Sequence, residues 1–190
     1  AVSPLNTYGA TKLLMEKLFV AANNYLNPKK HRTRFIAVRY GNVFGSSGSV
    51  VPKFIEQIRL KQKITVTEPN MTRFSITMDE ALDFILHATT IGEGSEIFVP
   101  KLRSYSIQVV RDALVEILND TGVEIIGIRP GEKLHEEMIS EVDSVNSVEL
   151  LNCYLILPNS KYNKLTKKFY KNINKDCKFL KEGFVYNSLN

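Results

Sequence analysis

The sequence predicts an α/β fold built around a largely parallel sheet. Apolar residues switch repeatedly between a spacing of two, which is typical of strands, and a spacing of 3.6, which is typical of helices. Segments of the two kinds alternate along the chain, and this alternation favours strand–helix–strand units. The composition of the 190 residues, 44% apolar and 24% charged, is that of a globular protein and excludes a disordered chain.

The helices are expected where apolar residues recur every three to four positions and where a residue can begin or end a helix. Asn6 or Thr7 can cap the first helix, in which Leu14 and Leu18 belong to the apolar stripe. Pro52 suits the first residue of the second helix. The helices expected on these grounds are residues 7–26, 52–62, 77–91, 106–119 and 133–140.

The third helix has the most distinctive start. Thr77 and Glu80 have the spacing of a capping box, in which each side chain hydrogen-bonds to the backbone N–H of the other residue. Gly92 is expected to end this helix. The residues expected on its buried face are Ala81, Leu82, Ile85, Leu86 and Ala88.

The strands are expected where short apolar or β-branched runs lie between helices. Residues 35–38 form an apolar run, and all residues of 64–67 are β-branched. Residues 40–51 between them form a loop rich in glycine and serine. The expected strands are residues 35–38, 64–67, 96–99, 123–128 and 153–157.

The net charge of +5 comes from the end of the chain. Residues 1–150 carry 17 basic and 18 acidic residues, whereas residues 151–190 carry eight lysines against two acidic residues. A nucleic-acid surface would combine basic residues with arginine, aromatic residues and a recognisable binding fold. We therefore expect the lysine-rich stretch to be a solvated surface and expect no nucleic-acid partner.

Several other classes of protein are excluded. Cys153 and Cys177 are too few for a disulfide scaffold and fit a reducing compartment, so we expect a cytoplasmic protein. No stretch approaches the roughly 18 apolar residues of a membrane-spanning helix. His31, His87 and His135 lack the spacing of metal ligands, so no metal is expected and His135 is placed on the surface of a helix.

Tyr8 and Lys12 are the first candidate catalytic pair. They are four residues apart in the first expected helix and therefore share one face. A lysine ammonium beside a tyrosine phenol favours the phenolate, so such a pair can act as a general acid/base. Tyr25 and Lys29 have the same spacing, but Pro28 is expected to end the helix before Lys29.

Loops after the expected strands supply further candidates, because ligands of open α/β sheets bind beyond the carboxyl ends of strands. Gly41 and Gly45 would allow a ligand to approach the backbone closely. Arg73 and Arg129 suit a diphosphate, since a guanidinium can hold two phosphate oxygens, although each alone would more often be a surface ion pair. The G-x-G-x-x-G fingerprint of dinucleotide binding does not occur in the sequence.

Five motifs occur in order along the chain: P-L-N-T-Y-G-A-T-K, R-Y-G-N-V-F-G-S-S-G-S-V-V-P, M-T-R-F-S-I-T, E-I-F-V-P-K and I-G-I-R-P-G-E-K-L-H-E-E-M-I. On these motifs the chain resembles the nucleotide-sugar 4,6-dehydratases of the extended short-chain dehydrogenase/reductase superfamily. It is most similar to the inverting UDP-N-acetylglucosamine 4,6-dehydratases of bacterial flagellin and capsule sugar synthesis. The resemblance is dense over residues 1–157. It implies the C-terminal part of an extended Rossmann-like doubly wound sheet plus the smaller substrate-binding domain.

The resemblance also implies a reaction, with NADP or NAD as cofactor and a UDP-sugar as substrate. Hydride would leave C4 of the sugar, water would be eliminated across C5 and C6, and hydride would return to C6. Tyr8 would deprotonate the C4 hydroxyl with the help of Lys12. The residues implied to contact the cofactor are Tyr8, Lys12, Tyr40, Gly41, Asn42 and Val43.

The resemblance further implies which residues contact the nucleotide-sugar. Arg73 and Arg129 would hold the diphosphate, and Glu132 would hold the uridine ribose. The full set implied to line the nucleotide-sugar cleft is Asn42, Val50, Thr65, Thr67, Arg73, Arg129 and Glu132.

The domain organisation follows from the same resemblance. Residues 1–52 would be a remnant of the NAD(P)-binding Rossmann domain, and residues 158–190 a basic C-terminal extension. Residues 53–157 would be mainly substrate-binding, with some segments returning to the Rossmann sheet. The family's Thr-Asp-Lys stretch and dinucleotide fingerprint would precede Ala1, so we expect part of a longer, homo-oligomeric enzyme that is inactive alone. A UDP-sugar 4-epimerase and a non-catalytic sugar-nucleotide-binding remnant stay open as alternatives.

Overall fold

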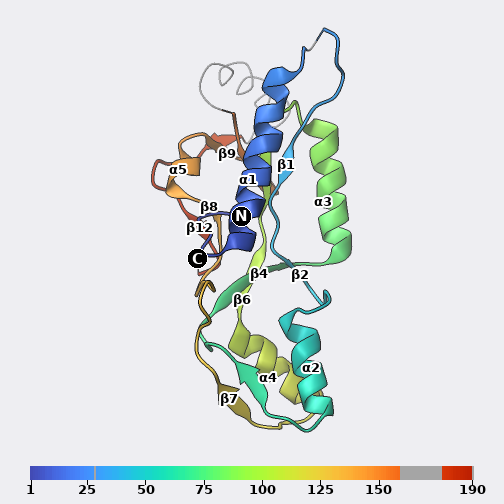
Figure 1. The fold of residues 1–190 in the computed structure, drawn as a ribbon, viewed down its shortest axis with the longest axis vertical. Helices are drawn as coiled ribbons and strands as arrows, with labels where there is room; N and C mark the ends of the chain where they lie inside the picture. The colour runs from blue at the N-terminus through green and yellow to red at the C-terminus, as the bar shows by residue number, and fades with distance from the viewer. Residues whose placement is uncertain (28, 159–176, 190) are drawn as a thin grey trace. The chain divides into compact units, whose positions relative to one another are not determined.

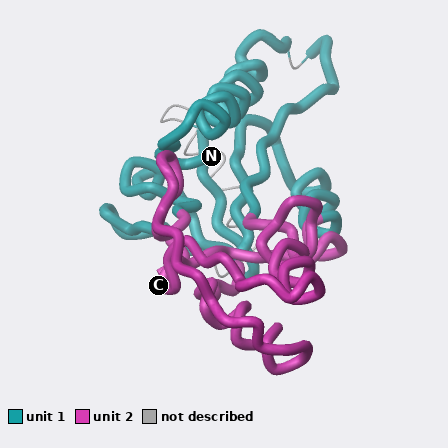
Figure 2. The backbone as a smooth tube through the Cα atoms, turned by 60° about the horizontal axis from the view of Figure 1, so that its bottom comes forward, with its two compact units in different colours: residues 1–40, 82–101, 137–186 teal, residues 41–81, 102–136, 187–190 magenta. Residues whose placement is uncertain are grey.

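The computed structural model describes residues 1–27, 29–158 and 177–189, which form two compact units (Figure 2). Unit 1 comprises residues 1–40, 82–101 and 137–186, and unit 2 comprises residues 41–81, 102–136 and 187–190. Neither unit is continuous in sequence. Six of the eight lysines of the lysine-rich stretch considered above for nucleic-acid binding fall on residues 159–176, outside the described residues.

Unit 1 is built on a mixed five-stranded sheet with the strand order β1-β5-β10-β9-β11 (Figure 1). Only β1 and β5 are parallel, with Ala37 opposite Ile97, and the other neighbours are antiparallel. The strands of this sheet are β1 (Ala37–Val38), β5 (Ile97–Pro100), β9 (Ser147–Glu149), β10 (Cys153–Ile156) and β11 (Lys178–Phe179). The remaining elements are α1 (Thr7–Ala22), a 3₁₀ turn (Asn23–Tyr25), most of α3 (Met78–Ile91), β8 (Glu137–Ile139) and α5 (Glu141–Ser144). The terminal strand β12 (Tyr186–Asn187) pairs with β8 and has one residue in each unit.

Unit 2 contains two smaller sheets and two helices. One sheet has the order β2-β4-β6, with β2 parallel and β6 antiparallel to β4, and the other is the parallel pair β3–β7. The helices α2 and α4 lie side by side (Figure 1). The bounds are β2 (Asn42–Val43), α2 (Val50–Arg59), β3 (Ile64–Val66), β4 (Thr72–Ile76), β6 (Arg103–Ser106), α4 (Ile107–Ile117) and β7 (Val123–Ile125).

Each unit has a hydrophobic core of its own. In unit 1, Phe98 and Leu155 are fully buried in a cluster that includes α3 and the central strands of the five-stranded sheet. In unit 2, Phe54 of α2 and Ile64 of β3 are fully buried in a second cluster, together with Ile107 of α4. Residues 82–101 and 137–157 thus share unit 1 with residues 1–40. The division into a cofactor-binding remnant up to residue 52, a mainly substrate-binding region up to residue 157 and a C-terminal extension stays a prediction.

The α/β class is confirmed, and most of the expected elements are present. Asn6 caps α1 by accepting a hydrogen bond from the Gly9 N–H (2.8 Å). The capping box also forms, because Glu80 accepts the Thr77 N–H (2.8 Å) and Thr77 accepts the Glu80 N–H (3.2 Å). The second helix begins at Val50, before Pro52. The five-stranded sheet and the β2-β4-β6 sheet are mixed. The strands β2, β4, β6, β8, β9, β11 and β12 were not expected.

The helix expected at residues 133–140 is wrong. Residues 137–139 are the strand β8, and α5 begins only after the capping residue Ser140. The backbone of Glu136 hydrogen-bonds to a distant segment: its N–H donates to Ser188 Oγ and its carbonyl accepts the Ser188 N–H, both at 2.8 Å. These long-range hydrogen bonds replace the local ones that a helix would need.

The buried faces of two helices also differ from expectation. On α3, Ala81 and Ala88 are buried as expected, but Leu82 and Leu86 are exposed. Phe84 and Ile91 pack against the core in their place. On α1, Leu14 and Leu18 are exposed and the buried residue is Glu16. Both helices are apolar on more than one side, so the spacing of apolar residues did not define which side is buried.

Candidate functional site

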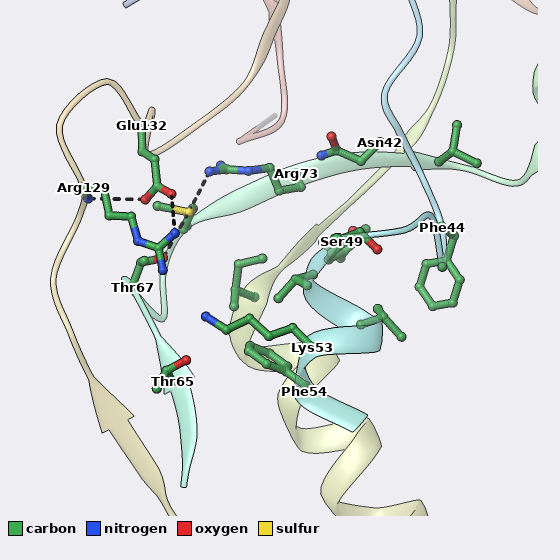
Figure 3. A pocket seen from close by; sticks show the side chains of 18 residues that line it. Asn42, Phe44, Ser49, Lys53, Phe54, Thr65, Thr67, Arg73, Arg129 and Glu132 are labelled. Carbon is green, nitrogen blue, oxygen red and sulfur yellow. Dashed lines mark hydrogen bonds and ion pairs between the residues drawn. The ribbon is translucent and has the colours of Figure 1, made fainter. Parts of the chain in front are cut away.

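Unit 2 contains a pocket of about 280 Å³ (Figure 3). It is lined by β2, the loop after it, the start of α2, the strands β3 and β4, and the segment after β7. The residues implied by the resemblance to contact a nucleotide-sugar all lie in its wall: Asn42, Val50, Thr65, Thr67, Arg73, Arg129 and Glu132. They come from four separate stretches of the sequence, and the fold brings them together.

Strand pairing explains how these residues meet. The parallel pair β2–β4 places Asn42 opposite Ser75, which is two residues from Arg73. The parallel pair β3–β7 places Thr65 opposite Glu124, so the segment that follows β7 passes the end of β3 and carries Arg129 to the pocket. Carboxyl ends of neighbouring parallel strands meet at one edge, which is where α/β proteins bind ligands.

Arg73 is largely buried and is held by protein acceptors. Its Nη1 donates to the carbonyls of Thr72 (2.7 Å) and Leu134 (3.3 Å), and its Nη2 donates to Met71 Sδ (2.7 Å). Its Nε lies 3.7 Å from Glu136 Oε1. A guanidinium has five N–H groups; within the described residues three of them donate hydrogen bonds, Nε faces Glu136, and the second N–H of Nη2 is left for a ligand.

Arg129 is in a different environment. Its side chain is 56% exposed and its Nη1 lies 4.0 Å from Glu132 Oε1. The loop that carries both residues is shaped by backbone contacts, since the Arg129 N–H donates to Glu132 Oε2 (3.3 Å) and the Glu132 N–H donates to the Arg129 carbonyl (3.0 Å). In Figure 3 the side chains of Arg73, Arg129 and Glu132 extend toward the same side of the pocket. A loosely paired, exposed guanidinium is available to an anion.

Three further groups in or beside the pocket were not singled out by sequence reasoning. Lys53 extends from the first turns of α2 along the pocket (Figure 3). Ser49 stands at the start of α2, and its buried Oγ has no hydrogen-bond partner within the described part of the chain. Burial, and then the charge of Glu136, raise the pKa of the Tyr105 phenol, so that Tyr105 stays a neutral donor. The only sequence signal for Ser49 and Lys53 was the loop rich in glycine and serine at residues 40–51, which contains Ser49 and ends just before Lys53.

Glu136 is the other group that the sequence did not reveal. Its carboxylate accepts the Asn42 amide (3.1 Å to Oε1) and the Phe74 N–H (3.1 Å to Oε2), and it faces Arg73. His135 beside it is half-buried and lies 2.7 Å from Thr72 Oγ1, so its expected place on the surface of a helix is wrong. Both the surface position expected for His135 and the failure to single out Glu136 follow from expecting a helix at 133–140, which does not form.

The structure places Tyr8 and Lys12 on one face of α1, in unit 1. The Lys12 Nζ lies 5.4 Å from the centroid of the Tyr8 ring, and Tyr8 is 73% exposed. The pair therefore has the proximity that its spacing predicted and is accessible to a ligand. An ammonium near the face of the ring is also attracted by the ring itself.

The segment that begins at Tyr40 joins the two units: Tyr40 is the last residue of this part of unit 1, and Gly41 is the first of unit 2. Gly41 is required by packing, because a Cβ there would lie 2.7 Å from the Cβ and carbonyl oxygen of Phe74. Gly45 and Gly48 line the pocket and have φ of +73° and +75°, a backbone conformation that glycine adopts without strain. Their role is thus to shape the loop that leads into α2.

Arg39, at the end of β1, forms a buried cluster of ion pairs in unit 1. Its Nε and Nη2 each donate to a carboxylate oxygen of Glu16 on α1 at 2.7 Å. Its Nη1 donates to Asp143 Oδ2 (2.9 Å) and to the Met138 carbonyl (2.8 Å). This one side chain therefore connects the helix that carries Tyr8 and Lys12 with β1, β8 and α5.

Within residues 1–27, 29–158 and 177–189, no three His, Cys, Asp or Glu side chains are placed to hold a metal ion. Over the same residues, no helix combines the length and the apolarity needed to cross a membrane.

Comparison with known proteins finds relatives in sequence and in structure. The chain is 44% identical over 192 positions to the UDP-N-acetylglucosamine 4,6-dehydratase (inverting) of Campylobacter jejuni, covering all of this chain and 56% of that protein. It is 40% identical over 157 residues to the UDP-glucose 4-epimerase of Rickettsia bellii, covering 82% of this chain and 46% of that protein. Among solved structures, Pen from Bacillus thuringiensis has a TM-score of 0.82 and 35% identity, over 98% of this chain and 54% of that chain.

The chain thus spans about half the length of the curated relatives it matches. The family model described as "Polysaccharide biosynthesis protein" matches residues 1–158. On this match and on the identity to the Campylobacter dehydratase, the chain belongs to the polysaccharide biosynthesis protein family of extended short-chain dehydrogenases/reductases.

Proposed function

We propose that this chain supplies the nucleotide-sugar pocket and the Tyr–Lys pair of an NADP-dependent nucleotide-sugar 4,6-dehydratase, acting on UDP-N-acetylglucosamine. The observation that carries the proposal is the convergence of seven residues, spread over residues 42–132, on a single pocket in unit 2. The 44% identity to the Campylobacter dehydratase supports the same substrate.

The chemistry of the pocket suits a nucleoside diphosphate. Arg73, Arg129 and Lys53 provide three cations around one space, and phosphate oxygens are the ligands that such a set attracts. Glu132 supplies a carboxylate that can accept the two hydroxyl groups of a ribose. The α2 N-terminus and the unpartnered Ser49 Oγ, within the described residues, add donors at the same wall.

The residues of unit 1 fit the nicotinamide end of a dinucleotide cofactor, because the Lys12 ammonium is close to an accessible Tyr8 phenol. When bound, NADP, or NAD, would accept hydride from C4 of the sugar and return it at C6, after water has left across C5 and C6. Tyr8 would take the proton of the C4 hydroxyl on its phenol oxygen, and Lys12 would stabilise that phenolate and hold a ribose hydroxyl. The segment of residues 40–43 would border the nicotinamide.

A UDP-sugar 4-epimerase is the second candidate, and the 40% identity to the Rickettsia epimerase favours it. Both activities would use Tyr8 and Lys12 to oxidise C4, so these residues do not discriminate between them. A non-catalytic sugar-nucleotide-binding remnant is the third candidate. For either enzyme we propose a homo-oligomeric, cytoplasmic protein.

The test is product analysis with the longest natural form of the protein that contains this chain, incubated with UDP-N-acetylglucosamine and NADP. We expect a 6-deoxy-4-keto sugar nucleotide, identified by mass spectrometry and NMR. A 4-epimer without any 6-deoxy product would overturn the dehydratase proposal in favour of the epimerase. We expect no turnover by residues 1–190 alone, since no dinucleotide fingerprint occurs in them.

A further inference from the structure

Glu136 is not among the residues that line the pocket, but it contacts two that are. Its carboxylate accepts the side-chain amide of Asn42 on β2 and faces the guanidinium of Arg73 on β4. We propose that Glu136 is a positioning residue of the nucleotide-sugar site, which orients Asn42 and Arg73 toward the ligand without contacting it. This inference rests on the proposed function of that pocket.

The contact with Glu136 determines which end of the Asn42 amide faces the ligand. A carboxylate only accepts hydrogen bonds, so the end of Asn42 that lies 3.1 Å from Glu136 Oε1 is the donating Nδ2. The Oδ1 of Asn42 is then the end left for the ligand, and it can accept from a hydroxyl or an amide N–H. Without Glu136 the amide could rotate and present either end.

The same carboxylate determines how Arg73 is presented. Nη1 is used by two backbone carbonyls, and Nε points toward Glu136 at 3.7 Å. Nη2 donates one of its N–H groups to Met71 Sδ (2.7 Å), so the guanidinium plane is held by Nη1, Nε and Nη2, and the second N–H of Nη2 is the part offered to an anion. An arginine fixed in this way loses less side-chain entropy when it binds phosphate.

Glu136 is itself fixed, as a positioning residue must be. Its second carboxylate oxygen accepts the Phe74 N–H (3.1 Å), and its backbone exchanges hydrogen bonds with the buried Ser188. Ser188 in turn donates to the Thr72 carbonyl (3.1 Å), one residue before Arg73. The side chains of Glu136 and Arg73 are 30% and 16% exposed, so the ion pair between them is partly shielded from solvent, whereas Asn42 is exposed.

The test measures UDP binding by the full 190-residue chain, by calorimetry, with the Glu136→Gln variant. Glutamine has nearly the same shape, but its amide nitrogen cannot accept, so either the Asn42 amide or the Phe74 N–H loses its acceptor and Arg73 loses its counter-charge. We expect about a tenfold loss of affinity for UDP. The matched control is Glu137→Gln, which removes a carboxylate charge one residue further along the chain. The Glu137 carboxylate belongs to unit 1, where it accepts a hydrogen bond from Ser3 Oγ (3.4 Å). This control variant should bind UDP like the wild type.

Double-mutant cycles separate positioning from a general effect on the fold. If Glu136 acts through Asn42 and Arg73, Glu136→Gln should cost less affinity in an Asn42→Ala or Arg73→Ala background than in the wild type. Unchanged UDP affinity in Glu136→Gln, or purely additive losses in both cycles, would overturn the inference.

A second readout does not depend on UDP. The NMR signals of the Asn42 side-chain amide and of the Arg73 Nε–H should shift in Glu136→Gln but not in Glu137→Gln. If the wild-type chain fails to bind UDP, the proposed function of the pocket fails, and these signals still decide whether Glu136 orients the two side chains. If they do not shift, the positioning role itself is refuted.

Discussion

Two arginines with one expected role lie in different surroundings, and this difference predicts different behaviour on mutation. Arg129 is exposed and loosely paired, so Arg129→Ala should weaken UDP binding about tenfold and leave the free energy of unfolding unchanged. Arg73 donates to the carbonyls of Thr72 and Leu134, so Arg73→Ala should weaken binding and also cost about 1–3 kcal/mol of stability. Calorimetry with UDP and urea unfolding measure the two effects.

The control for both is Arg59→Ala, which removes an exposed arginine from the last turn of α2, outside the pocket. It should change neither affinity nor stability by more than a few tenths of a kcal/mol. If Arg129→Ala binds UDP as tightly as Arg59→Ala does, Arg129 is not part of a diphosphate site. Both arginines could be chosen from the sequence, but the burial of Arg73 could not, because it depends in part on the carbonyl of Leu134, 61 residues away.

At the scale of elements, α5 is a helix of four residues that depends on its contacts. Ser140 and Asp143 form a capping box, and Asp143 also accepts from Arg39. Burial alone would raise the pKa of Asp143, but the charge and hydrogen bond of Arg39, together with Ser140, outweigh it and lower that pKa. The carboxylate therefore stabilises the fold above its unfolded pKa of about 4, and this contribution is lost as the pH falls through its lower folded pKa.

Asp143→Asn should consequently lower the free energy of unfolding by about 2 kcal/mol at pH 7. The difference from the wild type should shrink as the pH is lowered below about 4, because the wild-type carboxyl then becomes neutral as well. Urea unfolding at a series of pH values measures this, with Glu141→Gln on the same helix as a control that keeps the wild-type pH dependence. If the difference in the free energy of unfolding between Asp143→Asn and the wild type stays constant from pH 7 to pH 3, the charge of Asp143 does not stabilise this element.

Elements defined by local signals were predictable from the sequence, and those defined by distant partners were not. Asn6 and the Thr77–Glu80 box bond within one turn, so their residue types alone located the starts of α1 and α3. The strand β8 and the role of Glu136 depend on partners more than 50 residues away, such as Ser188. The residues next to them in the sequence do not indicate which distant residues they will contact. The candidate pocket residues were found through ordered motifs, whereas Lys53, Ser49 and Tyr105 belong to the pocket only through its shape.

At the scale of the whole molecule, the chain passes repeatedly between two units, so no boundary in the sequence separates them. Each unit has its own buried cluster, and the pocket is lined only by residues of unit 2. Regions with separate cores can open in separate steps. A ligand that binds only the folded form of one region stabilises that region, by about 2.7 kcal/mol at a concentration of 100 Kd.

Saturating UDP should therefore slow hydrogen exchange selectively, as measured by NMR or mass spectrometry. The expected protection is at amides of β3, the start of α2 and the segment 129–132, which line the pocket. The amides of β5 and β10, in the core of unit 1, should exchange at unchanged rates. The Arg129→Ala variant at the same UDP concentration is the control, because weaker binding should reduce the protection without changing the free protein. Equal slowing in both units would mean that they open as one cooperative body, and no slowing in unit 2 would exclude UDP from the pocket.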